Sequence, residues 1–252
     1  MEKTRKKVSF FTLGCKLNFT ETSTIARSFT DDRYEVVNPG TKADIYVINT
    51  CSVTDIADRK CRQAIKKFNH QSPEALIAVV GCYAQLNPDE ISSIPGVDIV
   101  LGTNEKYNLA QFLSNARKRE LPEIHSCDLS DKDRFFPSFS SGDRTRSFLK
   151  VQDGCDYKCS YCTIPLARGK SRNQDIASII KEAQLIAREG TREIVLTGVN
   201  IGDFGKSTGE SFADLLRELA GVKGIERYRI SSIEPNLLTD EIIELAAMSP
   251  KI

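Results

Sequence analysis

Three cysteines crowd into the run GCDYKCSYC, and their spacing indicates metal chemistry. Cys155, Cys159 and Cys162 are separated by three and two residues, so three thiols share one short loop that supplies no fourth. An iron–sulfur cube usually takes four cysteines, and a site with three leaves one iron open to another ligand. An open metal position is typical of catalytic rather than structural sites. The run therefore predicts a reactive iron–sulfur centre.

A zinc ribbon is the alternative interpretation of these thiols. Ribbons usually carry two C-x2-C pairs, whereas this chain has one, formed by Cys159 and Cys162. The flanks favour an active-site loop, because residues 148–151 read as a short strand and Pro165 precedes helical periodicity that resumes near Ile176. A zinc-containing nucleic-acid-binding module is thus the remote, non-enzymatic alternative.

Three further cysteines each follow a predicted strand. Cys15, Cys51 and Cys82 come just after the apolar runs VSFFTL, DIYVINT and ALIAVVG. Ligands gather at the carboxyl edge of open α/β sheets, where neighbouring strands lie only about 5 Å apart. These thiols can therefore converge as a second cluster site. The alternative is three buried cysteines that behave as small hydrophobic residues.

Two more cysteines and both histidines lack such placement. Cys61 falls inside a predicted helix, and Cys127 falls in a segment without periodicity. His70 and His125 lie in polar surroundings with no ligand spacing. We expect the two cysteines to be bystanders and the histidines to have no catalytic role.

Composition limits the possible classes of protein. The chain has 252 residues, of which 40% are hydrophobic and 27% charged, enough for two modest domains with cores of their own. The net charge of +1 means that any nucleic-acid contact must come from local patches. No apolar stretch approaches the ~18 residues of a membrane span, and the start MEKTRKK is unlike a signal peptide. We therefore expect a cytoplasmic protein with reduced thiols.

The order of apolar and periodic segments predicts two α/β regions. Residues 7–118 alternate short strands with helices at 20–29, 56–68, 84–94 and 109–116, the pattern of a parallel sheet. Residues 119–146 have no sustained period and read as a linker. From residue 147 three βα units follow, with helices at 176–188, 212–220 and 239–248.

The segments that carry the cysteines resemble a known family. C-x3-C-x2-C with Tyr161 before its third cysteine is similar to the radical S-adenosylmethionine (SAM) superfamily. The longer run VQDGCDYKCSYCTIPLARGKSR resembles the methylthiotransferases, and within them the branch that modifies threonylcarbamoyladenosine in tRNA. FFTLGCKLNFTET, VINTCSVT and VVGCYAQ resemble the cysteine-bearing segments of that family's first domain.

This resemblance implies a domain order. Residues 1–118 would form the N-terminal methylthiotransferase domain, and residues 147–252 the first three units of a radical-SAM βα barrel, joined by the linker 119–146. Nothing in the chain corresponds to the family's small C-terminal RNA-binding domain. We therefore expect a truncated chain with a partial barrel.

The resemblance also implies the reaction. An adenine C2–H bond is not appreciably acidic, and the C2 carbon carries no leaving group. Attaching sulfur at C2 therefore requires a radical. One [4Fe-4S] cluster would cleave SAM to a 5′-deoxyadenosyl radical, and a second [4Fe-4S] cluster would deliver the methylated sulfur. The implied partners are an anticodon loop, whose bases are already unstacked, and an electron donor protein, with the enzyme a monomer. Isopentenyladenosine tRNA and a ribosomal-protein side chain are the alternative substrates.

Individual roles follow from the matching positions. The resemblance assigns the first cluster to Cys155, Cys159 and Cys162 and the second to Cys15, Cys51 and Cys82. SAM contacts are expected from Tyr161 and from strand-end residues that offer close backbone approach, an amide or a carboxylate, namely Gly198, Asn200 and Glu234. Arg168 and Arg172, beside the cysteine loop, are expected to contact RNA phosphates.

Overall fold

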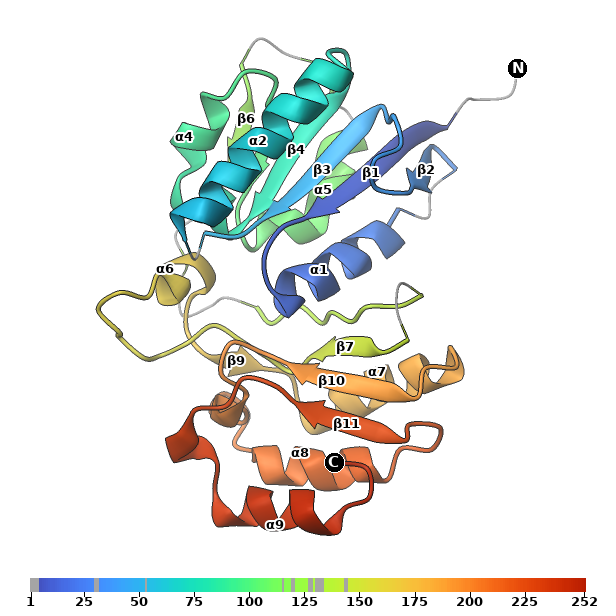
Figure 1. The fold of residues 1–252 in the computed structure, drawn as a ribbon, viewed down its shortest axis with the longest axis vertical. Coiled ribbons are helices and arrows are strands. Elements are labelled where there is room, and N and C mark those ends of the chain that lie inside the picture. The colour runs from blue at the N-terminus through green and yellow to red at the C-terminus, as the bar shows by residue number, and fades with distance from the viewer. Residues whose placement is uncertain are drawn as a thin grey trace. The chain divides into compact units, whose positions relative to one another are not determined.

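The chain folds into two compact units. The computed structural model describes residues 5–29, 32–52, 54–114, 116–118, 121–126, 129, 134–142 and 145–252. The first unit comprises Met1–Leu129 with Tyr161–Ala167, and the second comprises Ser130–Ser160 with Arg168–Ile252 (Figure 1). Among the described residues, no helix is both long and apolar enough to cross a membrane.

A parallel sheet forms the centre of the first unit. Its strand order is β2-β1-β3-β4-β5-β6, and every neighbouring pair is parallel, which confirms the α/β class. The strands are β1 (Lys6–Thr12), β2 (Tyr34–Val37), β3 (Ile45–Thr50), β4 (Leu76–Gly81), β5 (Ile99–Leu101) and β6 (Glu123–His125). Every residue of β3 and β4 is buried, because helices cover both faces, and this explains their unbroken apolar runs.

Two helices of the first unit, those that follow Cys15 and the strand before Cys82, begin earlier than the periodicity predicts. The helices of this unit are α1 (Lys16–Arg27), α2 (Asp55–Gln71), α3 (Cys82–Leu86), α4 (Pro88–Ser92), the 3-10 turn η1 (Glu105–Asn108) and α5 (Leu109–Ser114). The helix predicted at 84–94 is two helices, because Pro88 has no N–H to donate and so starts a new one. Cys15 and Cys82 thus lie at helix starts.

Part of the predicted linker belongs to the first sheet. β6 pairs with β5 through Glu123, Ile124 and His125. Three residues are too few to show a period, so the sequence gives no sign of this strand. Cys127 lies outside the described residues, and the predicted domain boundaries at 118 and 147 stay predictions.

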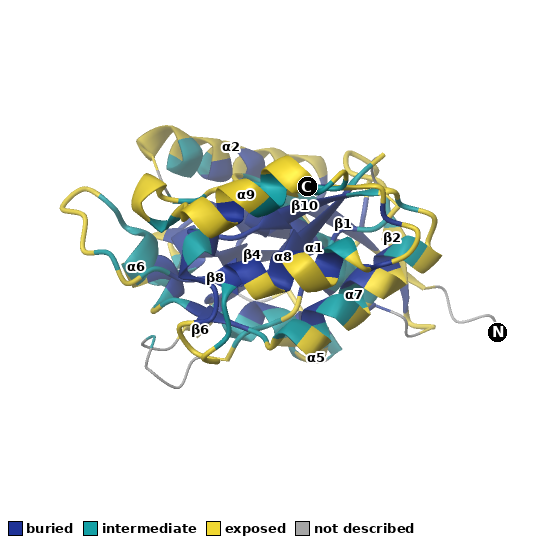
Figure 2. Cartoon of the chain, turned by 90° about the horizontal axis from the view of Figure 1, so that it is seen from below, coloured by how far each residue is buried: buried dark blue, intermediate teal, exposed yellow. Residues whose placement is uncertain are grey.

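The second unit has a parallel sheet with the order β11-β10-β7. Its strands are β7 (Ser147–Lys150), β10 (Glu193–Thr197) and β11 (Arg227–Ile230), and its helices are α7 (Ile176–Arg188), α8 (Phe212–Ala220) and α9 (Asp240–Met248). These agree with the three predicted βα units. Figure 2 shows the outer faces of α7, α8 and α9 exposed, while their inner faces bury apolar side chains such as Ile179, Leu216 and Ile242.

Short elements after β7, β10 and β11 were not predicted. They are the antiparallel pair β8 (Gln152–Asp153) and β9 (Arg172–Asn173), the helix α6 (Ile164–Arg168), and the 3-10 turns η2 (Ile201–Asp203) and η3 (Pro235–Leu237). Pro165, which follows the cysteine loop, lies in the first turn of α6, where a proline is tolerated. Strand-end segments in the second unit are therefore folded rather than open loops.

Candidate iron–sulfur and cofactor sites

Cys15, Cys51 and Cys82 follow the ends of three neighbouring strands. β3 lies between β1 and β4, and Thr50, just before Cys51, is in register with Gly81, just before Cys82. The chain places these cysteines at one carboxyl edge because all three strands are parallel. Cys51 and Cys82 are buried and Cys15 is exposed.

The turn that carries Cys15 packs against Cys51. Gly14 has φ +105°, a conformation that favours glycine, and a Cβ added there would lie 2.4 Å from the Cys51 Cβ and 2.9 Å from its Sγ. A larger residue at this position would have to displace the Cys51 side chain. Two of the three predicted ligands are thus brought to adjacent positions by a glycine turn.

A buried amide connects the same two segments. The Asn18 side chain donates through Nδ2 to the carbonyls of Leu13 and Thr50, both at 2.8 Å. Its Oδ1 lies 3.9 Å from the Cys15 Sγ. Because one rigid amide group holds the residues beside Cys15 and Cys51, their spacing depends on Asn18.

A second amide leaves an unsatisfied acceptor at this edge. Asn49 donates through Nδ2 to the Asn18 carbonyl at 3.0 Å and to Thr22 Oγ1 at 2.9 Å. Its Oδ1 is buried without a hydrogen-bond partner in the described part of the chain. That oxygen faces Gly81, where an added Cβ would lie 2.4 Å away. A polar acceptor atom therefore lies next to the residue that precedes Cys82.

The donor set of this edge suits an iron–sulfur cluster. Three thiols are soft ligands of the type such clusters take. Across the described ranges, however, no three His, Cys, Asp or Glu side chains are already gathered to hold a metal ion. The residues therefore fit the group by chemistry, and the ligand assignment stays a prediction.

Cys61 lies elsewhere, inside α2. It is buried, and burial raises the pKa of its thiol to about 12. In the metal-free protein this thiol therefore keeps its proton at neutral pH. Its buried position on α2 agrees with the interpretation as a bystander.

The second cysteine set occupies the segment between β8 and α6. Cys155 and Cys159 lie in the second unit, whereas Cys162 lies in Tyr161–Ala167, which groups with the first. Cys159 is exposed, and the other two are half-buried. Beside Cys162, the Thr163 hydroxyl donates to the Ser52 carbonyl within the first unit, at 3.1 Å. Tyr161 is 90% exposed.

The start of this loop is firmly held. Gly154 has φ +73°, and an added Cβ would lie 2.0 Å from the Lys170 carbonyl oxygen. Cys155 N–H donates to the Gly169 carbonyl at 3.0 Å, and Ser171 N–H donates to Asp156 Oδ1 at 2.9 Å. Residues 169–171 therefore fix the direction in which the chain enters the cysteine loop.

A buried carboxylate gathers three cations directly before the loop. Asp153 accepts from Lys150 Nζ at 2.8 Å and from Arg168 Nη1 at 2.9 Å, and Arg172 Nη2 lies 3.5 Å away. Burial acts to raise the pKa of Asp153, but these three cations outweigh it and hold that pKa well below its ordinary value. Asp153 is therefore ionised at neutral pH.

These ion pairs change the interpretation of the two arginines. Arg168 is 0% exposed and Arg172 is 8% exposed, so neither guanidinium is at the surface where a phosphate could reach it. Arg172 also donates through Nη1 to the Arg168 carbonyl at 2.6 Å. The structure does not support RNA contact at these residues; it gives them a structural part in holding the loop.

Predicted SAM-contacting residues come together in the second unit. Asn200 Oδ1 accepts from the Glu234 N–H at 3.2 Å, which joins the segment after β10 to the segment after β11. Asn200 Nδ2 is buried and has no hydrogen-bond partner within the described ranges. An orphaned donor beside a carboxylate-bearing loop is compatible with a bound polar ligand such as the methionine part of SAM.

Sequence reasoning missed Gln152 and Asp153. Gln152 is buried and accepts through Oε1 from the N–H groups of Val199 and Asn200 at 2.9 and 3.0 Å. The available signal was the pair of polar residues between the apolar strand FLKV and the first cysteine of the loop. Two polar side chains at a strand end rarely stay buried without specific partners.

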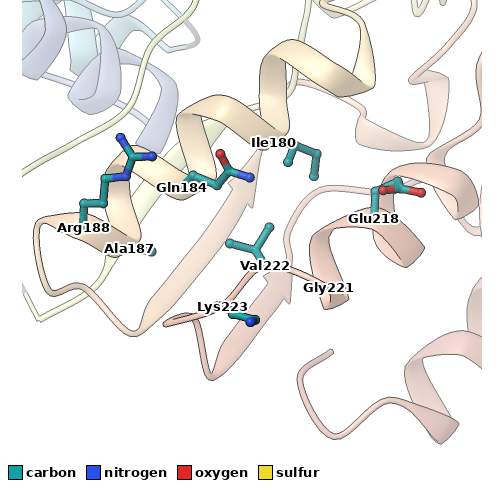
Figure 3. A pocket seen from close by; sticks show the side chains of 8 residues that line it. All are labelled: Ile180, Gln184, Ala187, Arg188, Glu218, Gly221, Val222 and Lys223. Carbon is teal, nitrogen blue, oxygen red and sulfur yellow. The ribbon is translucent and has the colours of Figure 1, made fainter.

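A cavity elsewhere in the second unit is not this site. It has a volume of about 610 Å³ and is lined by α7 and by the end of α8, with Gln184, Arg188 and Lys223 among its residues (Figure 3). None of the six predicted cluster cysteines or of the predicted SAM-contacting residues, all of them described, lines it. The cavity is thus separate from the predicted cluster and SAM-contacting residues.

Comparison with known proteins finds two family models that match separate parts of this chain. A family model described as "Uncharacterized protein family UPF0004" matches residues 7–102, and that of the Radical SAM superfamily matches residues 149–250. The chain is 44% identical to Threonylcarbamoyladenosine tRNA methylthiotransferase MtaB of Bacillus subtilis, over 97% of this chain and 55% of the relative. The chain belongs to the radical SAM methylthiotransferase family.

Two further relatives are named for different modified adenosines of tRNA. The Aquifex aeolicus protein of the same name as the Bacillus relative is 38% identical over 98% of this chain and 60% of its own length. A tRNA-2-methylthio-N(6)-dimethylallyladenosine synthase of Syntrophotalea carbinolica is 34% identical over 96% and 57%. The chain therefore spans little more than half the length of the curated relatives it matches.

A solved structure has the same fold. The radical S-adenosylmethionine methyltransferase TsrM from Kitasatospora setae, solved with tryptophan substrate and a SAM analogue, matches with a TM-score of 0.57 at 14% identity. The match covers 98% of this chain and 66% of that structure. At this identity the likeness supports the fold alone.

Proposed function

We propose that the protein inserts a methylthio group at C2 of N6-threonylcarbamoyladenosine next to the anticodon of tRNA. The supporting observation is that one chain carries two sets of three cysteines, one at a sheet edge and one on a single loop. The 44% identity to a relative named for this substrate supports the choice of tRNA base. Residues 1–118 and 147–252 are the proposed domains, and within the intervening 119–146 strand β6 completes the first sheet.

The proposal assigns a separate task to each set. Cys155, Cys159 and Cys162 would hold one [4Fe-4S] cluster, and the sheet-edge set of Cys15, Cys51 and Cys82 would hold the other. When bound, the first supplies an electron that splits SAM to a carbon radical, and the second carries the sulfur. An electron donor protein is required for this reduction. We place the reaction in the cytoplasm and the enzyme as a monomer.

The chain's own residues would orient SAM. The unpaired Asn200 amide donor and the Glu234 carboxylate offer partners of opposite character to the carboxylate and ammonium groups of its methionine part. Gly198 lets the backbone approach closely because it has no side chain. Tyr161, which is 90% exposed, stays a predicted contact only through its place beside Cys162.

Anaerobic iron and sulfide analysis tests the cluster assignment. We expect about eight irons per protein, falling to about four when either set of three cysteines is changed to alanine, because each cube holds about four. The Cys61→Ala variant is the control and should keep all the iron. Zinc in place of iron, or an iron content that neither triple variant lowers, would contradict the proposal and favour a zinc-containing module.

Mass spectrometry of tRNA nucleosides tests the substrate. A strain lacking the full-length protein should lose the methylthio form of threonylcarbamoyladenosine and regain it on complementation. Loss of the methylthio form of isopentenyladenosine instead would support the second candidate, which the 34% identity to a dimethylallyladenosine-modifying synthase favours. An unchanged nucleoside profile with an altered ribosomal protein would show the third substrate.

A further inference from the structure

We propose that Gln152 is a positioning residue that couples the cysteine loop to the SAM-contacting segment after β10. The proposal concerns a side chain with no role in the cluster assignments above. Its link to SAM rests on the proposed function, whereas the coupling of the two segments rests on geometry alone.

The Gln152 amide binds backbone on both sides. Its Nε2 donates to the carbonyls of Asp153 and Gly154 at 3.1 and 2.8 Å and to Ser171 Oγ at 2.9 Å. Its Oε1 accepts from Val199 and Asn200, as described above. Two amide hydrogens serve three acceptors, so one hydrogen is shared.

These partners define the orientation of the amide. The oxygen faces two backbone N–H groups, while the nitrogen faces two backbone carbonyls. Reversing the amide would place donor against donor and acceptor against acceptor. Both the oxygen and the nitrogen of the Gln152 amide therefore match their partners. Glutamate lacks the donors and methionine lacks donors and acceptor, so neither can make the same hydrogen bonds.

The sheet itself does not make this connection. β7 and β10 stay paired up to Lys150 and Thr197, and Val151 N–H then donates to the Thr197 carbonyl at 2.9 Å. Beyond that point the backbone N–H groups of Val199 and Asn200 leave the ladder. Gln152 is fully buried, so its side chain satisfies groups that water does not reach.

Gly198 makes room for the amide. A Cβ added to Gly198 would lie 2.8 Å from Gln152 Oε1 and 3.1 Å from its Cβ. Asn200, the next but one residue, is in turn bonded to the Glu234 N–H. One continuous set of contacts therefore runs from Gly154, at the start of the cysteine loop, through Gln152 to Asn200 and Glu234, two of the predicted SAM-contacting residues.

This arrangement has a functional consequence. SAM must reach the iron and the SAM-contacting segment together, so the two parts must keep a constant separation. A buried amide with backbone partners on both sides maintains that separation before the ligand arrives, which lowers the cost of ordering it on binding. Loss of Gln152 should therefore weaken SAM binding more than it weakens iron binding.

The test compares Gln152→Met, which removes every hydrogen bond at similar size, with Gln152→Glu, which keeps the acceptor and loses the donors. Gln184→Met, an exposed change on α7, is the control. Hydrogen exchange is measured on the full-length protein without iron, and SAM affinity on the reconstituted protein. The hydrogen-exchange measurement requires neither enzymatic activity nor bound clusters.

We expect Gln152→Met to speed exchange of the Val199 and Asn200 amides by about tenfold, since each lost hydrogen bond opens them. Gln152→Glu should leave those amides protected. It should speed exchange at the Cys155 amide, because the Gly154 carbonyl of the same peptide bond loses its donor. Both variants should weaken SAM binding by about tenfold while retaining iron at both cysteine sets. Gln184→Met should match the wild type in every measurement.

Each other result overturns part of the proposal. Unchanged exchange in Gln152→Met refutes the contact, and faster exchange with unchanged SAM affinity refutes the coupling. Failure of both variants to fold shows a core residue rather than a positioning one. If the wild type itself binds no SAM, the proposed function fails, while the exchange data still decide whether Gln152 joins the two segments.

Discussion

The two cysteine sets are supported by different kinds of structure. Cys15, Cys51 and Cys82 are distant in sequence and follow three adjacent parallel strands, so backbone pairing brings their segments together. Cys155, Cys159 and Cys162 are close in sequence and lie on a segment without helix or strand. There, buried side chains before the loop take the part that the sheet takes in the first unit: Asp153 holds the start of the loop, and Gln152 joins that start to the segment after β10.

This difference has a physical basis. A parallel sheet sets the spacing of strand ends whatever residues follow them, at about 5 Å between neighbours. A loop has no such constraint, and its direction depends on the few groups that bind its backbone. We therefore expect iron binding by Cys155, Cys159 and Cys162, the loop-borne set, to be the more sensitive to single substitutions outside the cysteines.

The largest expected effect compares the buried ion pairs of the two units. Asp153→Asn removes the carboxylate shared by three cations, and Glu21→Gln breaks the fully buried pair with Lys106, whose charged atoms are 2.6 Å apart. Each change should cost about 3–5 kcal/mol of stability, because it leaves buried positive charge with less compensation. Urea unfolding measures the loss.

Iron content separates the two variants. Asp153→Asn should also lower the iron held by the loop-borne set (Cys155, Cys159 and Cys162), since it removes the charge that holds Lys150 and Arg168 directly before the loop. Glu21→Gln should spare that set. Equal iron loss in both would contradict the distinction between the two supports.

The next effect concerns the glycines before the cysteines. Gly154→Ala forces a Cβ against a backbone carbonyl that cannot move, and we expect a cost above about 2 kcal/mol. Gly14→Ala meets the Cys51 side chain, which can shift, so a cost of about 1–2 kcal/mol is expected. Thermal unfolding with iron analysis measures both changes.

Two other glycines serve as controls for backbone strain. Gly209 and Gly40 also have positive φ, at +78° and +92°, but an added Cβ meets nothing within 4 Å. Their alanine variants should show strain alone and keep all the iron. If Gly154→Ala behaves like Gly209→Ala, close packing at the loop is unimportant.

A smaller effect is expected at Asn18. Asn18→Ala removes the two hydrogen bonds to Leu13 and Thr50 and should cost about 1–3 kcal/mol. Because strand pairing still holds the edge, iron binding by the sheet-edge set should weaken without being abolished. Complete loss of that iron would show that the sheet alone is an insufficient support.

The smallest effect uses the helix caps of the two units. Asp175 caps α7 by accepting from the Ser178 N–H at 2.8 Å, and Thr54 caps α2 by accepting from the Ala57 N–H at 3.2 Å. Each alanine variant should lose about 1 kcal/mol at neutral pH. Urea titrations at several pH values measure both.

Only the Asp175 effect should depend on pH. The hydrogen bond from the Ser178 backbone holds the pKa of Asp175 below its ordinary value of 3.8. Its stabilisation is therefore complete above that value and is lost as pH falls through the lower, folded-state pKa. The difference between Asp175→Ala and wild type should shrink in acid, whereas the Thr54→Ala difference should persist.

Sequence patterns predicted much of the fold and less of the sites. Long periodic segments such as α7 and α8 were predicted at their observed bounds, because an amphipathic helix shows its period over several turns. The three-residue strand β6 and the split at Pro88 escaped detection, since tertiary pairing and a single missing N–H decide them. Arg168 and Arg172 looked like surface charges because burial of an arginine leaves no local signature.

By itself, the sequence determined the six cysteines, the strand ends that carry them and the family to which the chain belongs. These are local features: residue type, spacing and the alternation of apolar segments. Only the tertiary structure decided that Asn18 and Gln152 bind backbone on two sides, that Asp153 gathers three cations, and that two arginines face inward. Such roles depend on partners up to about fifty residues away in sequence, whose approach is set by the packing of the whole sheet and is not encoded at any one position.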